Sequence, residues 1–315
     1  MKGGMSMYKE HKLWEDYSWI SVTDPSEKDF SKIQKKFKLP RMYRSYILDP
    51  HERSRFDFNE EIKMGLLIWR VTVPMKEESS FKVMPISFIV SDKHLISAVN
   101  KQTAWINKYL EDILHDFNEK DEEKPSLPRI LLRLLWRINN HYVDQIDQVN
   151  KWREELANYR KRPTNHQIEA LSHLSDQLVY LTTAADNNVV AIQQMRLSSN
   201  SDTDEFKVGR REQDLMNDVE IETKQSQQIT RDAAELVDRL SNTYNNILNN
   251  NLNDTMRFLT IWSLILAAPP VISGFYGMNM HLPWARGEWA WTGTLVMTLA
   301  LVILTLWVYY RYRSK

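Results

Sequence analysis

The residues of this chain best suited to chemistry are neutral oxygen donors near its C-terminal end. Seven asparagines fall between Asn242 and Asp254, and Asn279 and His281 lie farther on, in the aromatic stretch YGMNMHLPW. Asparagine is a modest helix former with an uncharged amide oxygen, so a cluster of asparagines beside a membrane entrance suggests a set of hydrated, uncharged oxygens. A solvated helix face explains most of the asparagine cluster equally well.

Composition excludes several other kinds of chemistry. The chain has no cysteine, which removes disulfides, thiolate catalysis and cysteine-bound zinc. It has no phosphate-binding G-x-x-x-x-G-K-[ST] motif and no His-Glu-x-x-His motif. His166 and His173 share a helical face but lack a third ligand. The 41 basic residues equal the 41 acidic ones, so nothing indicates a nucleic-acid partner. We therefore expect a protein that is not an enzyme and has no organic cofactor.

Two uncharged runs near the C-terminus predict a membrane hairpin. Phe258–Ala285 contains no Lys, Arg, Asp or Glu, and neither does Trp289–Tyr310. Each supplies about 20 residues of helix, enough to cross the hydrocarbon core of a bilayer. Two buried helices of a soluble domain are the alternative. Basic residues close the second run (Arg311, Arg313 and Lys315), whereas the intervening loop carries only Arg286. The positive-inside rule then predicts a plasma-membrane protein with both termini in the cytoplasm.

The first run contains Ala268-Pro269-Pro270. Proline lacks a backbone donor and frees a carbonyl one turn earlier, and in lipid that carbonyl needs another partner. Such a helix is best placed against protein or a wet pore, although a plain kink is an equal alternative. Two helices of one chain cannot enclose a water-filled path, so a channel built from this chain must be an oligomer.

The N-terminal part reads as mixed α and β structure. Trp19–Asp24, Ile62–Val73 and Lys82–Val90 are expected strands, and a polar segment joins the last two as a hairpin turn. Asp24 is the expected N-cap of a helix that continues to about Lys38. From Ala98 onward the pattern is almost entirely helical.

Two long apolar stripes with three–four spacing predict antiparallel, coiled-coil-like helices. The first comprises Leu171, Leu174, Leu178, Leu181, Ala185, Val189 and Ile192, and the second Leu215, Val219, Ile229, Ala233, Leu236, Leu240, Tyr244 and Ile247. No proline or glycine interrupts the chain from Arg210 to Ala268. The second helix is therefore expected to run unbroken from the cytoplasm into the membrane. Such a helix either transmits movement from the cytoplasmic part to the membrane part or serves as a passive stalk.

A short motif connects these features to a known family. Tyr276-Gly277-Met278-Asn279 ends the first of two C-terminal spans, after a long helical domain and before a basic tail. This arrangement resembles the CorA family of divalent metal ion transporters, and WISVTDPSE fits the opening strand and helix of that family. The resemblance covers essentially the whole chain and is most specific between Asn253 and Asn279.

The resemblance implies a homopentameric funnel in the membrane lipid. Its fold class would be an α+β cytoplasmic domain (α/β/α), followed by long coiled-coil-like helices and a two-helix transmembrane hairpin. The expected ranges are 1–163 for the cytoplasmic domain, 164–257 for the helices and stalk, 258–276 for a pore-lining span, 277–288 for the external loop, 289–310 for the second span and 311–315 for the basic tail.

The resemblance also implies roles for particular residues. Asn279 would form the outer selectivity ring, with Tyr276, Gly277 and Met278 shaping it. Asn253, Met256 and Leu259 would face the pore, the last two as a hydrophobic constriction. Asp218 would help to bind a regulatory Mg²⁺ between neighbouring subunits.

The expected function is therefore uptake of Mg²⁺, with Co²⁺ and Ni²⁺ as alternative ions, driven by the membrane potential and gated by intracellular Mg²⁺. The loop after the motif departs from the family pattern: it reads MHLPWARGEWAW and contains a single acidic residue, Glu288. A zinc or other transition-metal transporter on the same scaffold remains an alternative, for which His281 is the relevant residue. A membrane-anchored coiled-coil scaffold that transports nothing is the third possibility.

Overall fold

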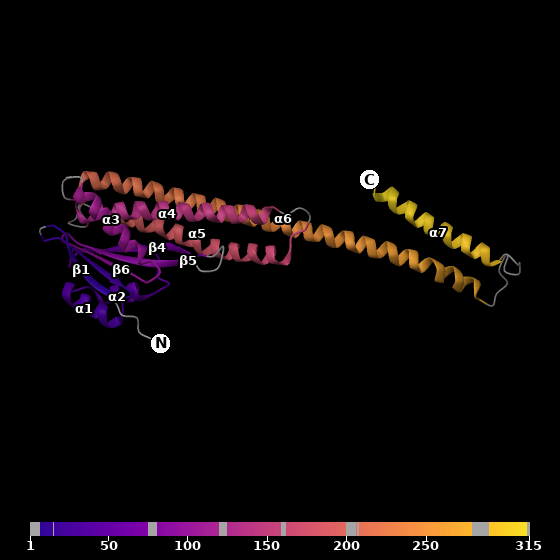
Figure 1. Ribbon diagram of the computed structural model, residues 1–315, viewed down its shortest axis with the longest axis horizontal. Helices are drawn as coiled ribbons and strands as arrows, with labels where there is room; N and C mark the ends of the chain where they lie inside the picture. The colour runs from indigo at the N-terminus through magenta and orange to yellow at the C-terminus, as the bar shows by residue number, and fades with distance from the viewer. Residues whose placement is uncertain are drawn as a thin grey trace. The chain divides into compact units, whose positions relative to one another are not determined.

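The computed structural model describes residues 7–14, 16–74, 81–119, 125–158, 162–199, 206, 208–278 and 290–313. They form two compact units, Met1–Ser241 and Asn242–Lys315. The elements in chain order (Figure 1) are β1 Met7–Lys12, β2 Ser18–Thr23, α1 Glu27–Phe37, α2 Arg41–Leu48, β3 Arg55–Asn59, β4 Met64–Pro74, β5 Phe81–Val90, β6 His94–Val99, α3 Trp105–Glu119, α4 Leu127–Ala157, α5 Asn165–Ser199, α6 Arg210–Tyr276 and α7 Ala290–Arg313.

A six-stranded sheet organises the first unit, with the strand order β1-β2-β6-β5-β4-β3. Neighbouring strands are antiparallel except β2 and β6, which are parallel. The three expected strands are confirmed as β2, β4 and β5. Their largely buried, apolar residues suit strands that are covered on both faces.

Helices cover both faces of the sheet. On one face α1 and α2 pack Phe30, Ile33 and Tyr43 against Ile20 and Leu66. On the other face Trp19 and Trp69 join the buried side chains of α3 and α4 in a larger core. Figure 1 shows α1 and α2 on one side of the strands and α3, α4 and α5 on the other. This is the α/β/α arrangement expected from the sequence.

The start of α1 differs from the expectation. Its N-cap is Ser26, whose Oγ accepts a hydrogen bond from the backbone N–H of Asp29 at 3.3 Å. Asp24 has a φ of 57° and lies before the cap. A short polar side chain tolerates this left-handed conformation. The expected N-cap was therefore wrong by two residues.

The expected stripe is confirmed throughout α5 and at four of its eight positions in α6. All seven apolar residues of the α5 stripe are buried. In α6, Val219, Ala233, Leu240 and Tyr244 are buried as expected, but Leu236 is exposed and Val237 takes its place in the core. The 67-residue helix α6 is continuous from the first unit into the second.

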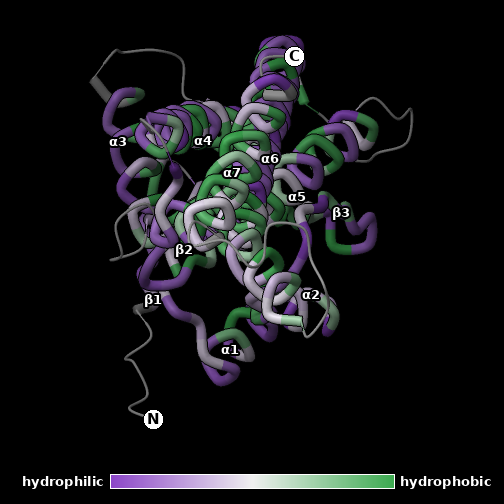
Figure 2. The backbone as a smooth tube through the Cα atoms, turned by 90° about the vertical axis from the view of Figure 1, so that its right-hand side faces the viewer, coloured by the Kyte–Doolittle hydropathy of each residue, from purple (hydrophilic) through white to green (hydrophobic). Residues whose placement is uncertain are grey.

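The second unit consists of the C-terminal part of α6 and α7. Both helices are long and apolar enough to cross a membrane, and their most apolar windows are 6% and 0% buried inside the protein. Figure 2 shows the turns of α7 mainly in green and white, the colours of apolar and neutral residues. Because these apolar surfaces are exposed, they do not behave as core helices of a soluble domain.

Candidate ion pathway and regulatory site

The sequence motif lies where α6 ends. Tyr276 is the last residue of the helix, and its hydroxyl lies 3.8 Å from Met297 Sδ on α7. The N–H of Gly277 donates to the carbonyl of Ser273 at 2.8 Å. A Cβ atom at Gly277 would lie only 3.1 Å from that same carbonyl oxygen. Glycine therefore lets the chain finish the last helical turn without a crowded side chain.

The remaining motif residues continue from this turn. The N–H of Met278 donates to Phe275 O at 3.4 Å, and the Met278 side chain is exposed. Asn279, the expected selectivity residue, lies outside the described residues, as does His281. Its role therefore stays a prediction from the sequence.

The three expected pore residues lie one or two turns apart on α6. Asn253 and Met256 line a cavity of 720 Å³ between α6 and α7, together with Arg257, Thr260, Ile261, Leu264, Leu304, Thr305, Val308 and Tyr309. Leu259 is not among the lining residues, although its side chain is 65% exposed. In one chain, therefore, Asn253 and Met256 contact this cavity and Leu259 does not.

Two prolines modify the backbone inside the first candidate membrane span. Pro269 and Pro270 both lie within α6. Neither has an N–H group, so the carbonyls of Ile265 and Leu266 lose their usual intrahelical donors. In a hydrocarbon environment these carbonyls need protein or water as partners. This favours placing that side of α6 away from lipid.

Asp218 lies in a groove of 460 Å³ formed by α3, α4 and α6. Asp116 lines the same groove, but so do Arg133 and Arg137, and Arg137 Nη1 lies 3.7 Å from the carboxylate of Asp112. Two guanidinium groups thus offset the acidic charge around Asp218. Among the described residues no group of three or more His, Asp or Glu side chains is placed to hold a metal. One chain therefore does not complete a metal site at Asp218.

One of the two histidines considered as metal ligands, His173, has a hydrogen-bonding partner inside the protein. His173 Nδ1 lies 2.9 Å from Gln177 Nε2, and the Gln177 Oε1 accepts from the backbone N–H of Phe81 at 3.4 Å. This chain of contacts joins α5 to β5. It gives His173 a structural partner instead of a metal.

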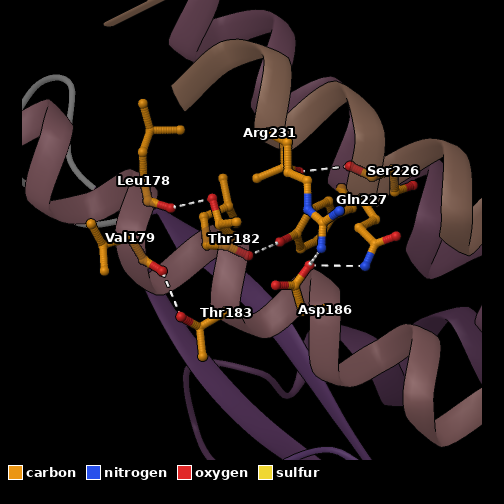
Figure 3. Close-up of polar contacts among 11 residues, drawn as sticks. Leu178, Val179, Thr182, Thr183, Asp186, Ser226, Gln227 and Arg231 are labelled. Carbon is orange, nitrogen blue, oxygen red and sulfur yellow. Dashed lines mark hydrogen bonds and ion pairs between the residues drawn. The ribbon is translucent and has the colours of Figure 1, made fainter. Parts of the chain in front are cut away.

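A polar cluster that the sequence pattern did not reveal joins α5 to α6 (Figure 3). Asp186 Oδ1 accepts from Gln227 Nε2 at 2.9 Å and from Arg231 Nη2 at 2.8 Å. Close by, the buried hydroxyl of Tyr142 on α4 donates to the carbonyl of Leu181 at 2.7 Å. The partners are about 40 residues apart in sequence and on different helices, so single-helix periodicity carries no signal for them.

A second ionic contact between the same helices lies closer to their connecting segment. The buried carboxylate of Glu220 is 2.8 Å from Arg196 Nη1 and 2.8 Å from Lys224 Nζ. These contacts are at ion-pair distance but lack hydrogen-bond geometry. Together with Asp186, Glu220 ties α6 to α5 at two levels.

Burial changes the acidity of several groups in the first unit. Burial lowers the pKa of His141, and the nearby carboxylate of Asp144 opposes that change. Burial also lowers the pKa of His94, and Lys36 adds to that effect. Desolvation raises the pKa of Tyr142, so this residue remains a neutral hydroxyl donor.

Comparisons with known proteins agree with this architecture. The family model described as "CorA-like Mg2+ transporter protein" matches residues 14–311. A cobalt/magnesium transport protein CorA from Methanocaldococcus jannaschii is 23% identical over 313 residues, covering 96% of this chain and 92% of that protein.

Solved structures show the same fold. The complete CorA magnesium transporter structure from M. jannaschii superposes with a TM-score of 0.75 at 18% identity, covering 94% of this chain and 90% of that one. The full-length CmaX protein superposes with a TM-score of 0.69 at 15% identity, covering 94% and 88%. The similarity therefore extends through the elements of the first unit and both helices of the second.

Proposed function

Since this chain belongs to the family of CorA-like Mg²⁺ transporters, we propose that it forms a homopentamer that admits Mg²⁺ through the membrane. The observation that carries the proposal is the placement of Tyr276-Gly277 at the end of α6, with Met278 and Asn279 directly after it. Five copies would repeat this motif around one axis. The long helix α6 would then line the path from the motif to the cytoplasm.

The residue types of the path suit Mg²⁺. This ion gives up its water reluctantly and prefers oxygen ligands. The amide oxygen of Asn279 would contact the hydrated ion at the outer entrance. A carboxylate at the same place would carry a negative charge and would retain the ion longer. Asn253 would offer the same chemistry at the inner end of the span, and Met256 and Leu259 would narrow the path between them.

The membrane potential supplies the driving force. An inside-negative potential favours entry of a divalent cation by about 4.6 kcal/mol per 100 mV, twice the value for a single charge. No nucleotide is required. With both termini in the cytoplasm, the asparagine at position 279 would face the external solution, where uptake begins.

Control by intracellular Mg²⁺ is the second part of the proposal. Asp218 would supply one ligand of a regulatory Mg²⁺ between neighbouring copies, and the adjacent copy would supply the others, because the described part of one chain does not gather them. Bound Mg²⁺ would favour the closed arrangement of the α6 helices, and its loss would allow them to move.

Ion flux into liposomes containing the purified protein tests the proposal. We expect inward Mg²⁺ flux that Asn279→Ala abolishes, because the neutral oxygen ring is lost at every subunit. Met280→Ala, at the next position and outside the motif, is the matched control and should retain flux. Parallel measurements with Co²⁺, Ni²⁺ and Zn²⁺ separate a magnesium system from a zinc transporter. A protein that moves none of these ions would refute the proposal and favour the scaffold alternative.

A further inference from the structure

The cavity between α6 and α7 is polar at one end and apolar at the other. Its α6 wall begins with Asn253 and Arg257 and ends with Leu264, and its α7 wall extends from Leu304 to Tyr309. Because the two helices are antiparallel, the amide, the guanidinium group and the phenol lie at one end and the two leucines at the other. Within about 16 Å of helix the lining thus changes from polar to apolar, as a lipid does from its headgroup to its chains.

Two threonines in the middle of the cavity do not make that part polar. The hydroxyl of Thr260 donates to the Met256 carbonyl at 2.8 Å, and the hydroxyl of Thr305 donates to the Leu301 carbonyl at 2.8 Å. Each hydroxyl is therefore already bonded to its own helix and needs no partner from a ligand. Ile261 adds an aliphatic side chain to the same region. The middle of the cavity therefore suits hydrocarbon better than water.

The polar end of the cavity carries an excess of positive charge. The second unit has five basic residues and only two acidic ones. Arg257 lines the cavity, and Arg311 and Arg313 follow its α7 wall in sequence. Of the two carboxylates, Asp254 is near Arg257 in sequence, whereas Glu288 belongs to the segment between the helices. Among the residues that the structure describes, Arg257 has no ion-pair partner, so its guanidinium group is available to an anion.

We propose that this cavity binds a phospholipid with a negatively charged headgroup, taken from the membrane leaflet at the basic end of α7. The phosphate lies beside Arg257, whose planar guanidinium group can donate two parallel hydrogen bonds to phosphate oxygens. One acyl chain lies between the helices, against Ile261 and Leu304. The positive-inside rule predicts that this leaflet is the cytoplasmic one. The inference goes beyond the proposed function, because it requires that α6 and α7 cross a membrane but not that the chain conducts ions.

The size and charge of the cavity favour a lipid over the other possible occupants. Its volume of 720 Å³ is within the range of about 300–1,000 Å³ that is typical of sites for small organic ligands. A free phosphate would leave the apolar end empty, whereas a lipid brings its own hydrocarbon to that end. A neighbouring copy of the chain carries the same excess of positive charge and therefore does not offset it. An anionic lipid satisfies both ends of the cavity.

The lipid contact lies beside one of the expected pore residues on α6. Arg257 follows Met256 by one residue, which is about 100° around the helix. Ile261 and Leu264 lie within about 40° of Arg257, so these three residues share the side of α6 that faces the cavity. Met256 lies at the edge of that side. One turn of α6 thus carries both the lipid contact and part of the expected constriction.

Native mass spectrometry of the purified full-length protein tests the proposal. The protein in detergent is given phosphatidylglycerol, which is anionic, or phosphatidylcholine, which has no net charge, and the bound lipid is counted. We expect the parent chain to retain phosphatidylglycerol about tenfold more strongly, the effect of one hydrogen-bonded charge pair. Arg257→Gln should lose this preference. Arg239→Gln removes the same charge from a part of α6 outside the apolar run and should keep the preference.

A second pair of variants tests the position of the acyl chain without changing the charge. Thr305→Phe places a ring in the cavity and should lower retention of phosphatidylglycerol about as much as Arg257→Gln does. Ile303 is exposed and lies on nearly the opposite side of α7 from Thr305. Ile303→Phe therefore adds the same ring outside the cavity and should leave retention unchanged.

Three outcomes would overturn the lipid site. Equal retention of the two lipids by the parent chain would favour a neighbouring copy as the occupant. Displacement of the lipid by glycerol phosphate, which has no acyl chains, would assign the cavity to soluble anions. Equal losses in all four variants would show that no particular residue holds the lipid. Because the lipid is counted without measuring flux, a protein that retains phosphatidylglycerol but conducts no ion refutes the transporter proposal and supports the lipid site.

Discussion

At the scale of single residues, His141 is a group whose protonation opposes folding. It lies half-buried on α4 with its ring centroid 4.6 Å from that of Trp105, and its Nε2 has no hydrogen-bond partner. Burial holds its pKa below the ordinary value of 6.5. The unfolded chain therefore takes up this proton at a higher pH than the folded chain does.

Protonation of His141 makes the stability of the folded chain depend on pH. Stability is highest where His141 is neutral in both states and falls as the pH drops below about 6.5, until the folded state is also protonated. We expect His141→Phe, which keeps a ring beside Trp105, to lose less thermal stability than the parent chain between about pH 7.5 and pH 5.5. The midpoint of unfolding in detergent, measured across this range, provides the test.

His94 is a second histidine whose protonation opposes folding. Its pKa is also lowered, chiefly by burial, so some acid sensitivity should remain in His141→Phe. Combining His141→Phe with His94→Phe should flatten the profile further. Parallel acid profiles for the parent chain and His141→Phe would contradict the assignment.

At the scale of elements, one buried amide fixes α5 to the end of the sheet. Strand β3 begins at Arg55, which pairs with Ile68 of β4. Arg70 of β4 therefore lies beyond the start of β3 and has no partner residue in that strand. There Asn188 Oδ1 accepts from the Arg70 N–H at 3.0 Å, and Asn188 Nδ2 donates to the Arg70 carbonyl at 2.9 Å. Ser54 Oγ also donates to Asn188 Oδ1 at 2.6 Å. The side chain thus replaces the missing strand residue.

Removing this amide should be costly. Asn188→Leu would leave the Arg70 backbone groups buried and unpaired, and we expect a loss of about 2–4 kcal/mol in unfolding free energy. Asn187→Leu, at the adjacent half-buried position, is the control and should change stability by about 0.5 kcal/mol or less. Denaturant titration of the two purified variants compares them. Equal losses would show that Asn188 stabilises through packing alone.

The ionic contact of Asp186 should behave differently. Its side chain and that of Arg231 are both about half exposed, so the pair contributes little to folding. We expect Asp186→Ala to lower stability by less than about 1 kcal/mol, while changing the Mg²⁺ concentration that half-inhibits flux, because α6 is less firmly joined to α5. Arg239→Ala, whose ion pair with Glu235 lies within α6 alone, is the control. Identical inhibition curves for all three chains would exclude this role.

The sequence predicted the elements unevenly, for identifiable reasons. The α5 stripe was confirmed at every position because a helix packed along its length repeats its burial in the spacing of apolar residues. Strand β1 was not predicted, since its residues MYKEHK are mostly polar and it lies at the edge of the sheet. Strand β6 was missed because its six residues adjoin a long helical region, and its place between β2 and β5 depends on contacts distant in sequence.

For the candidate site, the local pattern was again the informative part. The end of the first span and the motif after it were visible in composition and in the lack of charge. The contacts of Asp186, Glu220 and Asn188 were not, because each joins residues on separate elements. The arginines beside Asp218 likewise depend on how α4 packs against α6. They explain why the partner ligands of Asp218 are expected from another copy.

At the scale of the whole molecule, regulation by Mg²⁺ would require several copies. An ion held between copies binds only the assembled state and stabilises it, by about 2.7 kcal/mol when its concentration is a hundred times its dissociation constant. Mg²⁺ should therefore raise the unfolding midpoint of the full-length oligomer. Mg²⁺ should also slow proteolysis of the segments between helices, since proteolysis and thermal unfolding both depend on how much of the protein is in the assembled state.

Asp218→Ala tests this coupling. We expect the variant to assemble as the parent does, to lose most of the Mg²⁺-dependent rise in the midpoint, and to conduct Mg²⁺ with weaker inhibition from the cytoplasmic side. Asp238→Ala is the control, because Asp238 is an exposed carboxylate of the same helix, on nearly the opposite face. It removes the same charge and should retain the response. If both variants lose the Mg²⁺ effect equally, the ion acts through the general negative charge of α6, and a specific site at Asp218 is excluded.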